Sequence, residues 1–231
     1  MDLINIHILL ITIFFITLIF HSVILNNVYN VIENMKNKNK EDYNLILLGD
    51  SILNNENYVS NRDTVYSNLK SQYKKCYIYA EDNAVINDIN NQYDMIPKKL
   101  KNKDSIFVIS VGGNDLLNSY NYLMINKKDN KYFDSIWNEY KKTIIDLNNS
   151  KNKSKIAILN IYYPKDEEYK KYYPLIEKWN KRVKKLCIKE KMIYISIEKD
   201  VYKKSHFIDS IEPSSESSKI IADIIIDNTI S

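Results

Sequence analysis

All three glycines of this 231-residue chain lie in two short motifs, Gly-Asp-Ser at residues 49–51 and Gly-Gly-Asn-Asp at residues 112–115. Average glycine usage of about 7% would give roughly sixteen in a chain of this length. Glycine is needed where φ is positive or where another group approaches the backbone closely. Gly49, Gly112 and Gly113 therefore mark backbone positions that cannot carry a side chain. Each motif directly follows an apolar run, as an active site at a strand end requires.

Apolar runs that read as strands alternate with segments that have helical periodicity. The alternation predicts a parallel sheet covered by helices on both faces, with its active site at the carboxyl ends of the strands. The predicted strands are Tyr43–Leu48, Cys76–Ala80, Ser105–Val111, Lys155–Ile161 and Met192–Ile197. The predicted helices cover Thr64–Lys75, Val85–Leu100 with a break near Pro97, Tyr132–Leu147, and the apolar faces at residues 176–187 and 220–225.

The segment Leu3–Leu25 is almost wholly apolar, and a bilayer span needs about 20 such residues. We favour a retained single-pass membrane anchor over residues 1–25. A cleaved signal peptide is the alternative, although no Lys or Arg precedes the run and no small-residue cleavage site follows it. A buried core helix fits less well because the segment has no polar face. Residues 26–42 read as a polar linker, and residues 43–231 as the main domain.

The side of the membrane that carries the main domain is left open. Lys36, Lys38 and Lys40 follow the apolar segment and no basic residue precedes it, which points to the cytosol. The glycosylation sequons at Asn148 and Asn152 are expected by chance in a chain this rich in asparagine.

Composition gives no sign of a nucleic-acid partner, a metal or a cofactor. The net charge is +4 and acidic and basic residues are interspersed, so the lysine pairs read as solvated helix faces. No metal-ligand spacing is present, and two of the three histidines lie in the apolar N-terminal segment. Cys76 and Cys187 could pair in an oxidising compartment, but two buried free thiols are the favoured interpretation.

The two glycine motifs carry residues suited to acyl transfer. Ser51 follows a strand and would present its hydroxyl and its own N–H at the sheet edge, which a nucleophile with half of an oxyanion hole needs. Asn114 would place a neutral amide donor in the same crevice. Alternatively, Ser51 caps the next helix and residues 112–115 form a tight turn.

The motifs resemble those of the SGNH hydrolase superfamily, the GDSL esterases and lipases. Gly49–Leu53 resembles block I, Gly112–Asp115 resembles block III, and Asp209–Ser214 resembles block V, which is followed by an apolar helix. Trp179-Asn180 also fits the pattern. The resemblance extends from Tyr43 to the C-terminus and implies a three-layer α/β/α sandwich with a five-stranded parallel sheet. The family's habit points to a lumenal or extracellular location, against the charge bias that points to the cytosol.

By this resemblance Ser51 is the nucleophile, its N–H and the Asn114 side chain hold the oxyanion, and Asp209 is the acid of the triad. In block II, Asn83 stands where a glycine N–H normally completes the oxyanion hole. Asparagine tolerates left-handed backbone, so this N–H can still point inward.

Glu212 occupies the position of the triad histidine. A glutamate near pKa 4.3 is a poorer base than a histidine near 6.5, and repulsion from Asp209 would raise one of the two carboxyl pKa values. His206 is a substitute base only if its loop shifts toward Ser51; the alternative is a loop histidine in solvent.

Three functions remain open at this stage. The first is a membrane-anchored esterase or acyl hydrolase with an atypical base, acting on a small ester, a lipid or an acylated carbohydrate. The second is a catalytically inactive SGNH-fold protein that binds a partner in the same crevice. The third, a structural membrane protein, is disfavoured because glycine persists only in the motifs. The polar segment Tyr120–Tyr132 is a candidate lid or a simple surface loop.

Overall fold

The computed structural model of the protein describes residues 17–25, 43–101, 104–125, 131–150 and 154–229. The chain forms two units, Met1–Lys40 and Glu41–Ser231. In the first unit, residues 17–25 are helical with exposed side chains. Most of the predicted membrane segment and the predicted linker lie outside the described residues. Within the described parts of the chain, no helix is both long and apolar enough to cross a membrane.

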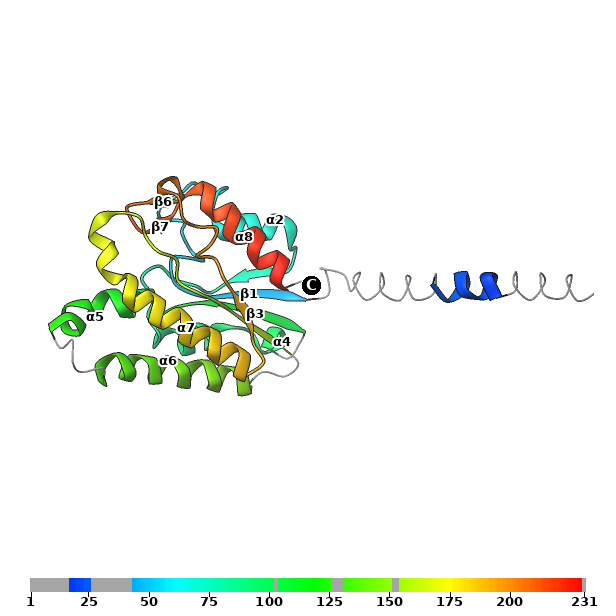
Figure 1. Ribbon diagram of the computed structural model, residues 1–231, viewed down its shortest axis with the longest axis horizontal. Helices are drawn as coiled ribbons and strands as arrows, with labels where there is room; N and C mark the ends of the chain where they lie inside the picture. The colour runs from blue at the N-terminus through cyan, green and yellow to red at the C-terminus, as the bar shows by residue number, and fades with distance from the viewer. Residues whose placement is uncertain (1–16, 26–42, 102–103, 126–130, 151–153, 230–231) are drawn as a thin grey trace, which may run out of the picture. The chain divides into compact units, whose positions relative to one another are not determined.

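The second unit is built on a five-stranded parallel sheet with the order β2-β1-β3-β4-β5 (Figure 1). The predicted strands are all present, with slightly different ends. Their bounds are β1 Asn44–Gly49, β2 Cys76–Ile78, β3 Ser105–Ser110, β4 Lys155–Leu159 and β5 Ile193–Ile195. A short antiparallel hairpin, β6 Phe207–Ile208 with β7 Glu212–Pro213, precedes the last helix.

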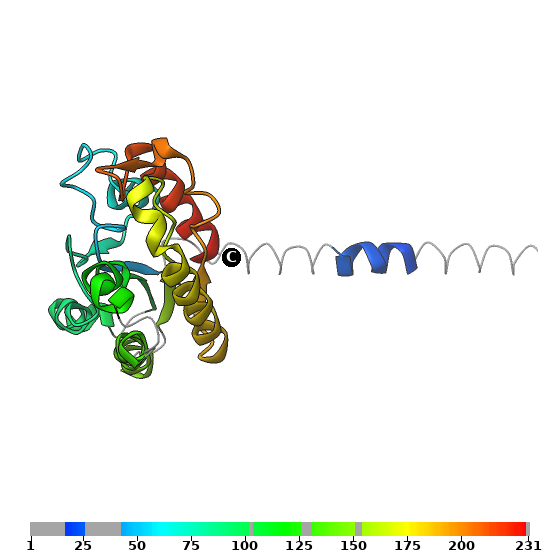
Figure 2. The same ribbon diagram turned by 60° about the vertical axis from the view of Figure 1, so that its left-hand side comes forward.

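Helices cover both faces of the sheet (Figures 1 and 2). Alternate residues of each central strand point to opposite sides: Ile46 and Phe107 pack into one core cluster, and Leu47 and Val108 into the other. The first cluster is closed by α3 Asp88–Met95, α6 Lys131–Ser150 and α7 Tyr173–Lys189. The second is closed by α2 Val65–Gln72 and α8 Ser215–Thr229. The expected three-layer α/β/α sandwich is confirmed.

The two cysteines lie in different core clusters. Cys187 belongs to the cluster closed by α6 and α7, and Cys76 to the cluster closed by α2 and α8. Both are buried free thiols, as the favoured interpretation predicted. Burial raises each thiol pKa to about 12, so neither is a reactive thiolate near neutral pH.

Sequence patterns located the helices less completely than the strands. The break near Pro97 is real: α3 ends at Met95 and α4 covers Lys98–Lys101. The segment Tyr120–Tyr132, expected as a candidate lid or a surface loop, is helical at both ends, because α5 extends over Gly113–Ile125 and α6 begins at Lys131. The N–H of Leu116 donates to the carbonyl of Gly112, which starts the helix directly after the glycine pair. The helix buries Leu116 before it enters this segment, and the polar composition there does not end it.

The carboxyl ends of β1 and β3 form the switch point of the sheet, since the chain leaves β1 toward β2 on one side and returns as β3 on the other. Gly49 is in register with Ser110 and has a φ of +126°. A Cβ at Gly49 would lie 1.7 Å from the carbonyl oxygen of Ser110. The first glycine is therefore required by close approach of two backbones.

The second motif is shaped by an aromatic cluster behind it. Gly112 has a φ of +112°, and a Cβ there would lie 2.3 Å from the Trp179 ring. That ring is held by edge contacts with Phe133, Trp137 and Tyr140, at centroid distances of 6.2, 5.6 and 4.8 Å. Gly113 differs, because a Cβ there would meet only an Asp50 carboxylate oxygen at 3.9 Å. The expectation that no motif glycine can carry a side chain is thus wrong for Gly113.

These contacts predict unequal effects of three alanine substitutions on stability. Gly49→Ala and Gly112→Ala should each lower the free energy of unfolding by about 3 kcal/mol or more, because each adds a clash to a positive φ. Gly113→Ala is the matched control and should change it by less than about 1 kcal/mol, since the residue begins α5 with ordinary space around it. Urea unfolding of the full chain measures all three. Equal effects at the three positions would contradict the conclusion that Gly49 and Gly112, but not Gly113, lack space for a side chain.

Candidate active site

Ser51 lies in the tight turn that follows β1. The N–H of Asp50 donates to the carbonyl of Ser110 at 2.9 Å, so the turn is fastened to the end of β3. Ser51 is 7% exposed and lines a pocket at the switch point. It does not cap the next helix: α2 begins at Val65, and Thr64 supplies its N-cap. The helix-cap alternative for Ser51 is therefore wrong.

Asp50 is buried beneath this turn with its carboxyl group at the pocket. One carboxylate oxygen accepts hydrogen bonds from the Ser110 hydroxyl at 2.8 Å and from the Ile52 N–H at 3.2 Å. Burial outweighs both bonds and, with repulsion from Glu212 and Asp115, raises the pKa of Asp50 to about 7. A large share of Asp50 is thus neutral at physiological pH.

Asn114 and Asp115 connect the start of α5 to the segment after β2. The Asn114 amide donates to the carbonyl of Ala84 at 3.0 Å and also lines the pocket. The Asp115 carboxylate accepts from the Ile86 N–H at 3.2–3.3 Å, and burial raises its pKa to about 6. An amide nitrogen carries two hydrogens, so Asn114 has a second one to offer to a ligand.

Asn83 has the left-handed backbone that the sequence predicted, with a φ of 61°. It is an exposed residue of the turn before Ala84, and it is not among the described residues that line the pocket. Its conformation is confirmed, while its part in an oxyanion hole stays a prediction.

Glu212 stands beside the nucleophile position. It begins β7, is 8% exposed, and lines the same pocket as Ser51. Burial raises its pKa, a hydrogen bond from the Ser51 side chain lowers it, and repulsion from Asp82 and Asp209 raises it further, with a net upward shift. Its second carboxyl oxygen, Oε2, is buried without a hydrogen-bond partner among the described residues. The structure thus pairs Ser51 with a carboxyl group.

Asp209 does not support Glu212 as a triad acid supports a histidine. It is exposed, it has a φ of 45°, and it acts on Glu212 through repulsion that raises the Glu212 pKa. Repulsion between these two carboxylates was expected from the sequence. Burial of Glu212, which is the larger cause of its raised pKa, was not expected from the sequence.

His206 is not a loop histidine in solvent, because only 1% of it is exposed. Its Nδ1 accepts from the N–H groups of Tyr202 and Lys203 at 3.1 and 3.4 Å, and its Nε2 lies 3.3 Å from a Glu216 carboxylate oxygen. Its carbonyl accepts from the Ser217 hydroxyl on α8. His206 does not line the pocket, and these contacts favour a structural role over that of a substitute base.

Two buried amide side chains support the site, and sequence reasoning missed both. Asn55 donates to the carbonyl of Pro213 at 3.0 Å and to the Ser218 hydroxyl at 2.6 Å, and it accepts from the Val65 N–H. It therefore ties the segment after Ser51 to the strand that carries Glu212. Gln92 on α3 makes two hydrogen bonds to the backbone of Gly49, at 2.7 and 2.9 Å. Asn55 does not stand out in an asparagine-rich chain, and Gln92 belongs to no motif.

The pocket beside Ser51 has a volume of about 60 Å³. One water needs about 10–15 Å³ on this measure, so the space holds a small group such as a short acyl chain. Its apolar wall comes from α5, from α7 and the segment before it, and from the segment that follows β4. The lining residues are Asp50, Ser51, Ile52, Gly113, Asn114, Leu116, Leu117, Ile161, Tyr162, Pro164, Tyr169, Tyr172, Ile176, Ile211 and Glu212.

The sequence model of the GDSL-like lipase/acylhydrolase family matches residues 25–225. The chain belongs to this family. The segments that resemble the family's motifs in sequence lie at the ends of β1 and β3 and in the hairpin before α8. No curated protein sequence matches the chain.

Solved structures of the family share the fold at low sequence identity. A lipase from a goat rumen metagenome is 18% identical with a TM-score of 0.66, covering 82% of this chain and 98% of its own. An acetyl xylan esterase from Geobacillus stearothermophilus is 16% identical with a TM-score of 0.58, covering 82% and 96%. Phospholipase A1 from Streptomyces albidoflavus is 12% identical with a TM-score of 0.59, covering 80% and 99%.

The raised pKa of Asp50 predicts a pH-dependent effect of Asp50→Asn on stability. The unfolded chain ionises Asp50 near 3.8 and the folded chain near 7, so ionisation lowers stability as pH rises through this window. Asparagine does not ionise, and its amide oxygen can accept the same two hydrogen bonds. The variant should match the wild type near pH 4 and exceed it by up to roughly 4 kcal/mol at pH 8. Urea unfolding across pH tests this, and a pH-independent difference refutes it.

Proposed function

We propose that the protein is a serine ester hydrolase in which Ser51 is the nucleophile and Glu212 is its general base. The observation that carries this proposal is that both residues are buried in the wall of one pocket, with hydrogen bonding to the Ser51 side chain among the influences on the Glu212 pKa. Membership of the GDSL-like lipase/acylhydrolase family supports the reaction class.

In the proposed acylation step, the Ser51 oxygen attacks the ester carbonyl carbon and its proton moves to the Glu212 carboxylate. The negative charge on the carbonyl oxygen is held by the Ser51 N–H and the Asn114 amide, with Asn83 as the further donor that the family pattern implies. When the tetrahedral intermediate collapses, the carbon–oxygen bond to the alcohol breaks and Glu212 returns the proton to the alcohol. Water then repeats the sequence on the acyl-enzyme and releases the acid.

The surroundings of Glu212 support its use as a base. A carboxylate near its ordinary pKa is weak at neutral pH, and efficiency improves as the pKa approaches the working pH. Burial and the neighbouring carboxylates raise the Glu212 pKa in that direction. Because the ionised form is the base, the reaction rate should rise with pH through the Glu212 pKa.

The small pocket supports a substrate with a short acyl group. Leu116, Leu117 and Ile176 line about 60 Å³ of space, which suits an acetyl or similar group better than a fatty chain. An acyl ester of a carbohydrate or of another alcohol fits this limit.

The alternative is a protein of the same fold that binds ligands without turning them over. One observation favours it: Asp209 is exposed and acts on Glu212 only through repulsion, so Glu212 lacks the acid partner that the family triad supplies.

We further propose that residues 3–25 anchor the protein in a membrane as a single pass. The support is their composition, an almost unbroken apolar run of the length that a bilayer span needs. Alkaline carbonate extraction should leave the full chain in the membrane pellet and release a chain that begins at Tyr43. Release of the full chain would refute the anchor.

The dyad predicts distinct outcomes for substitutions of its two members. A fluorophosphonate should label Ser51 of the full chain, and Ser51→Ala should abolish both labelling and hydrolysis of p-nitrophenyl acetate. Glu212→Gln should lower kcat about 10²–10⁴-fold because a general base is lost. Glu212→His should retain or raise activity.

Two further variants act as controls for the base. Asp209→Asn and His206→Gln should change kcat by less than about tenfold, because neither side chain serves as the base. If His206→Gln abolishes labelling while Glu212→Gln leaves it intact, the assignment of the base is wrong. If no variant or wild-type protein is labelled or turns over ester, the binding-protein alternative stands.

The oxyanion donor gives an independent prediction. Asn114→Ala should lower kcat about 10²–10³-fold with a smaller change in KM, since the amide stabilises charge that develops only during reaction. Asn118→Ala, an exposed residue on the same helix, is the matched control. A change confined to KM would contradict the role.

A further inference from the structure

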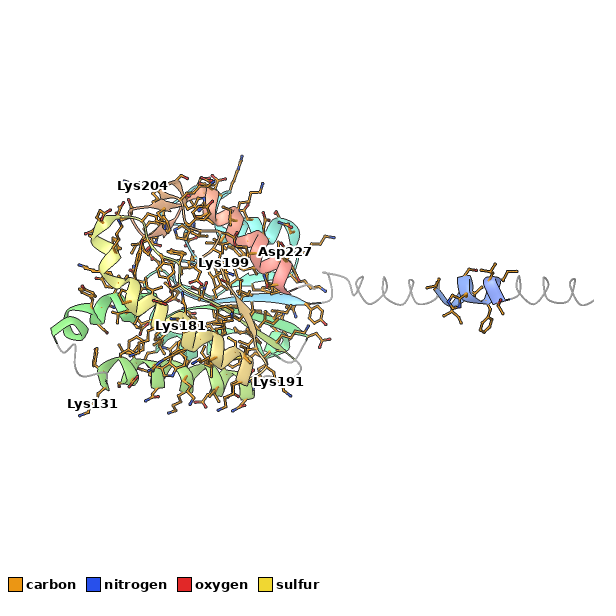
Figure 3. All side chains as sticks on the ribbon, in the orientation of Figure 1. Lys131, Lys181, Lys191, Lys199, Lys204 and Asp227 are labelled. Carbon is orange, nitrogen blue, oxygen red and sulfur yellow. The ribbon has the colours of Figure 1, made fainter. Side chains whose placement is uncertain are left out.

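The pocket beside Ser51 combines carboxyl groups with tyrosine rings. Asp50 and Glu212 lie in its wall together with Tyr162, Tyr169 and Tyr172. Among the described residues that line it, there is no lysine, arginine or histidine. Lys171, which is not a lining residue, contacts the ring of Tyr172, and the lysines labelled in Figure 3 are exposed.

Further carboxylates act on the same wall. Asp82 and Asp209 raise the pKa of Glu212, and Asp115 raises that of Asp50. Glu212 is only 8% exposed. One of its carboxyl oxygens, Oε2, is buried without a hydrogen-bond partner among the described residues. A buried, unpaired oxygen in an acidic pocket is a place where a positive group of a ligand gains the most.

The tyrosine cluster at the rim already binds an ammonium group of the protein itself. Tyr172 packs against Tyr120 at 4.2 Å and against Tyr169 at 5.9 Å between ring centroids. The Lys171 ammonium lies 4.8 Å from the Tyr120 centroid and 5.3 Å from the Tyr172 centroid. These distances are within the roughly 6 Å of a cation–π contact. The rings therefore attract a cation, and a ligand ammonium group takes the place of Lys171, whose side chain is exposed and free to turn into solvent.

We propose that the pocket selects esters that carry a fixed positive charge close to the ester bond, of the ammonium-alcohol class. The inference rests on the proposed ester hydrolysis and names its substrate class. The short acyl group occupies the apolar end of the pocket, and the ammonium group lies between the tyrosine rings and the carboxylates. Aromatic rings and carboxylates together are the usual means by which proteins hold quaternary ammonium groups.

The charge also aids the reaction itself. A positive group beside Glu212 favours the ionised carboxylate, which is the form that accepts the Ser51 proton. An anionic ester meets the opposite effect, because it approaches several carboxylates without a basic residue in the wall to receive it.

The test uses two esters of the same shape that differ in charge. Acetylcholine and 3,3-dimethylbutyl acetate differ by a nitrogen in place of a carbon. The full chain should hydrolyse acetylcholine with a kcat/KM about tenfold or more above that of the neutral ester, the size of one cation–π contact. Equal values for the two esters would overturn the inference and leave the proposed hydrolysis standing.

Matched substitutions identify the ring that holds the cation. Tyr172→Phe keeps the ring and should preserve the preference, while Tyr172→Leu should reduce it to about threefold or less. Tyr202→Leu removes an exposed tyrosine outside the pocket and should leave the preference unchanged. Loss of preference in Tyr172→Phe and in Tyr202→Leu as well would refute the role of this ring.

Binding is measured separately from turnover, so that the proposed ester hydrolysis and the proposed cation site can each be refuted without the other. Tetramethylammonium should raise the unfolding temperature of the full-length Ser51→Ala variant, and Tyr172→Leu in that background should abolish the increase. If neither ester is hydrolysed but tetramethylammonium binds, the hydrolysis is wrong and the cation site stands. If tetramethylammonium has no effect at millimolar concentration, the cation site is wrong.

Discussion

The candidate active site depends on how closely the ends of β1 and β3 approach each other. Gly49 lies so near the Ser110 carbonyl that no side chain fits between them, and Asp50 bonds to Ser110 through both backbone and side chain. This contact fixes the turn that presents Ser51. α5 begins at Gly113, shortly after Ser110, and from its first turn Asn114 reaches the same pocket. The sheet's switch point and the reacting groups are thus positioned by one backbone contact.

Replacing histidine by glutamate changes what the surroundings must do. A histidine base needs a carboxylate that orients it and stabilises its protonated form. A glutamate base needs surroundings that raise its pKa toward neutral pH. Burial of Glu212 and the nearby carboxylates act in that direction. Asp209 is exposed and contributes to this shift by repulsion, whereas the acid of a Ser-His-Asp triad holds its histidine by a direct contact.

Strands and motif glycines could be predicted from the sequence because their signals are local. An apolar run that ends in glycine defines a buried strand and a tight approach, and Asn83 takes the left-handed backbone expected of it. The supports of the site could not be predicted, because Asn55 and Gln92 act on residues distant in the chain. Composition likewise does not reveal the packing that buries His206. The same holds for the formation of helix α5 over residues 113–125.

The aromatic cluster behind Gly112 gives the protein an internal optical reporter. Both tryptophans of the chain, Trp137 and Trp179, lie in this cluster, and the Trp179 ring occupies the space that a Gly112 side chain would need. Tryptophan emission therefore originates directly behind the glycine pair that leads to Asn114. Ligand occupancy that moves this backbone can be followed by intrinsic fluorescence in the unmodified chain, without a chromogenic substrate or an attached dye.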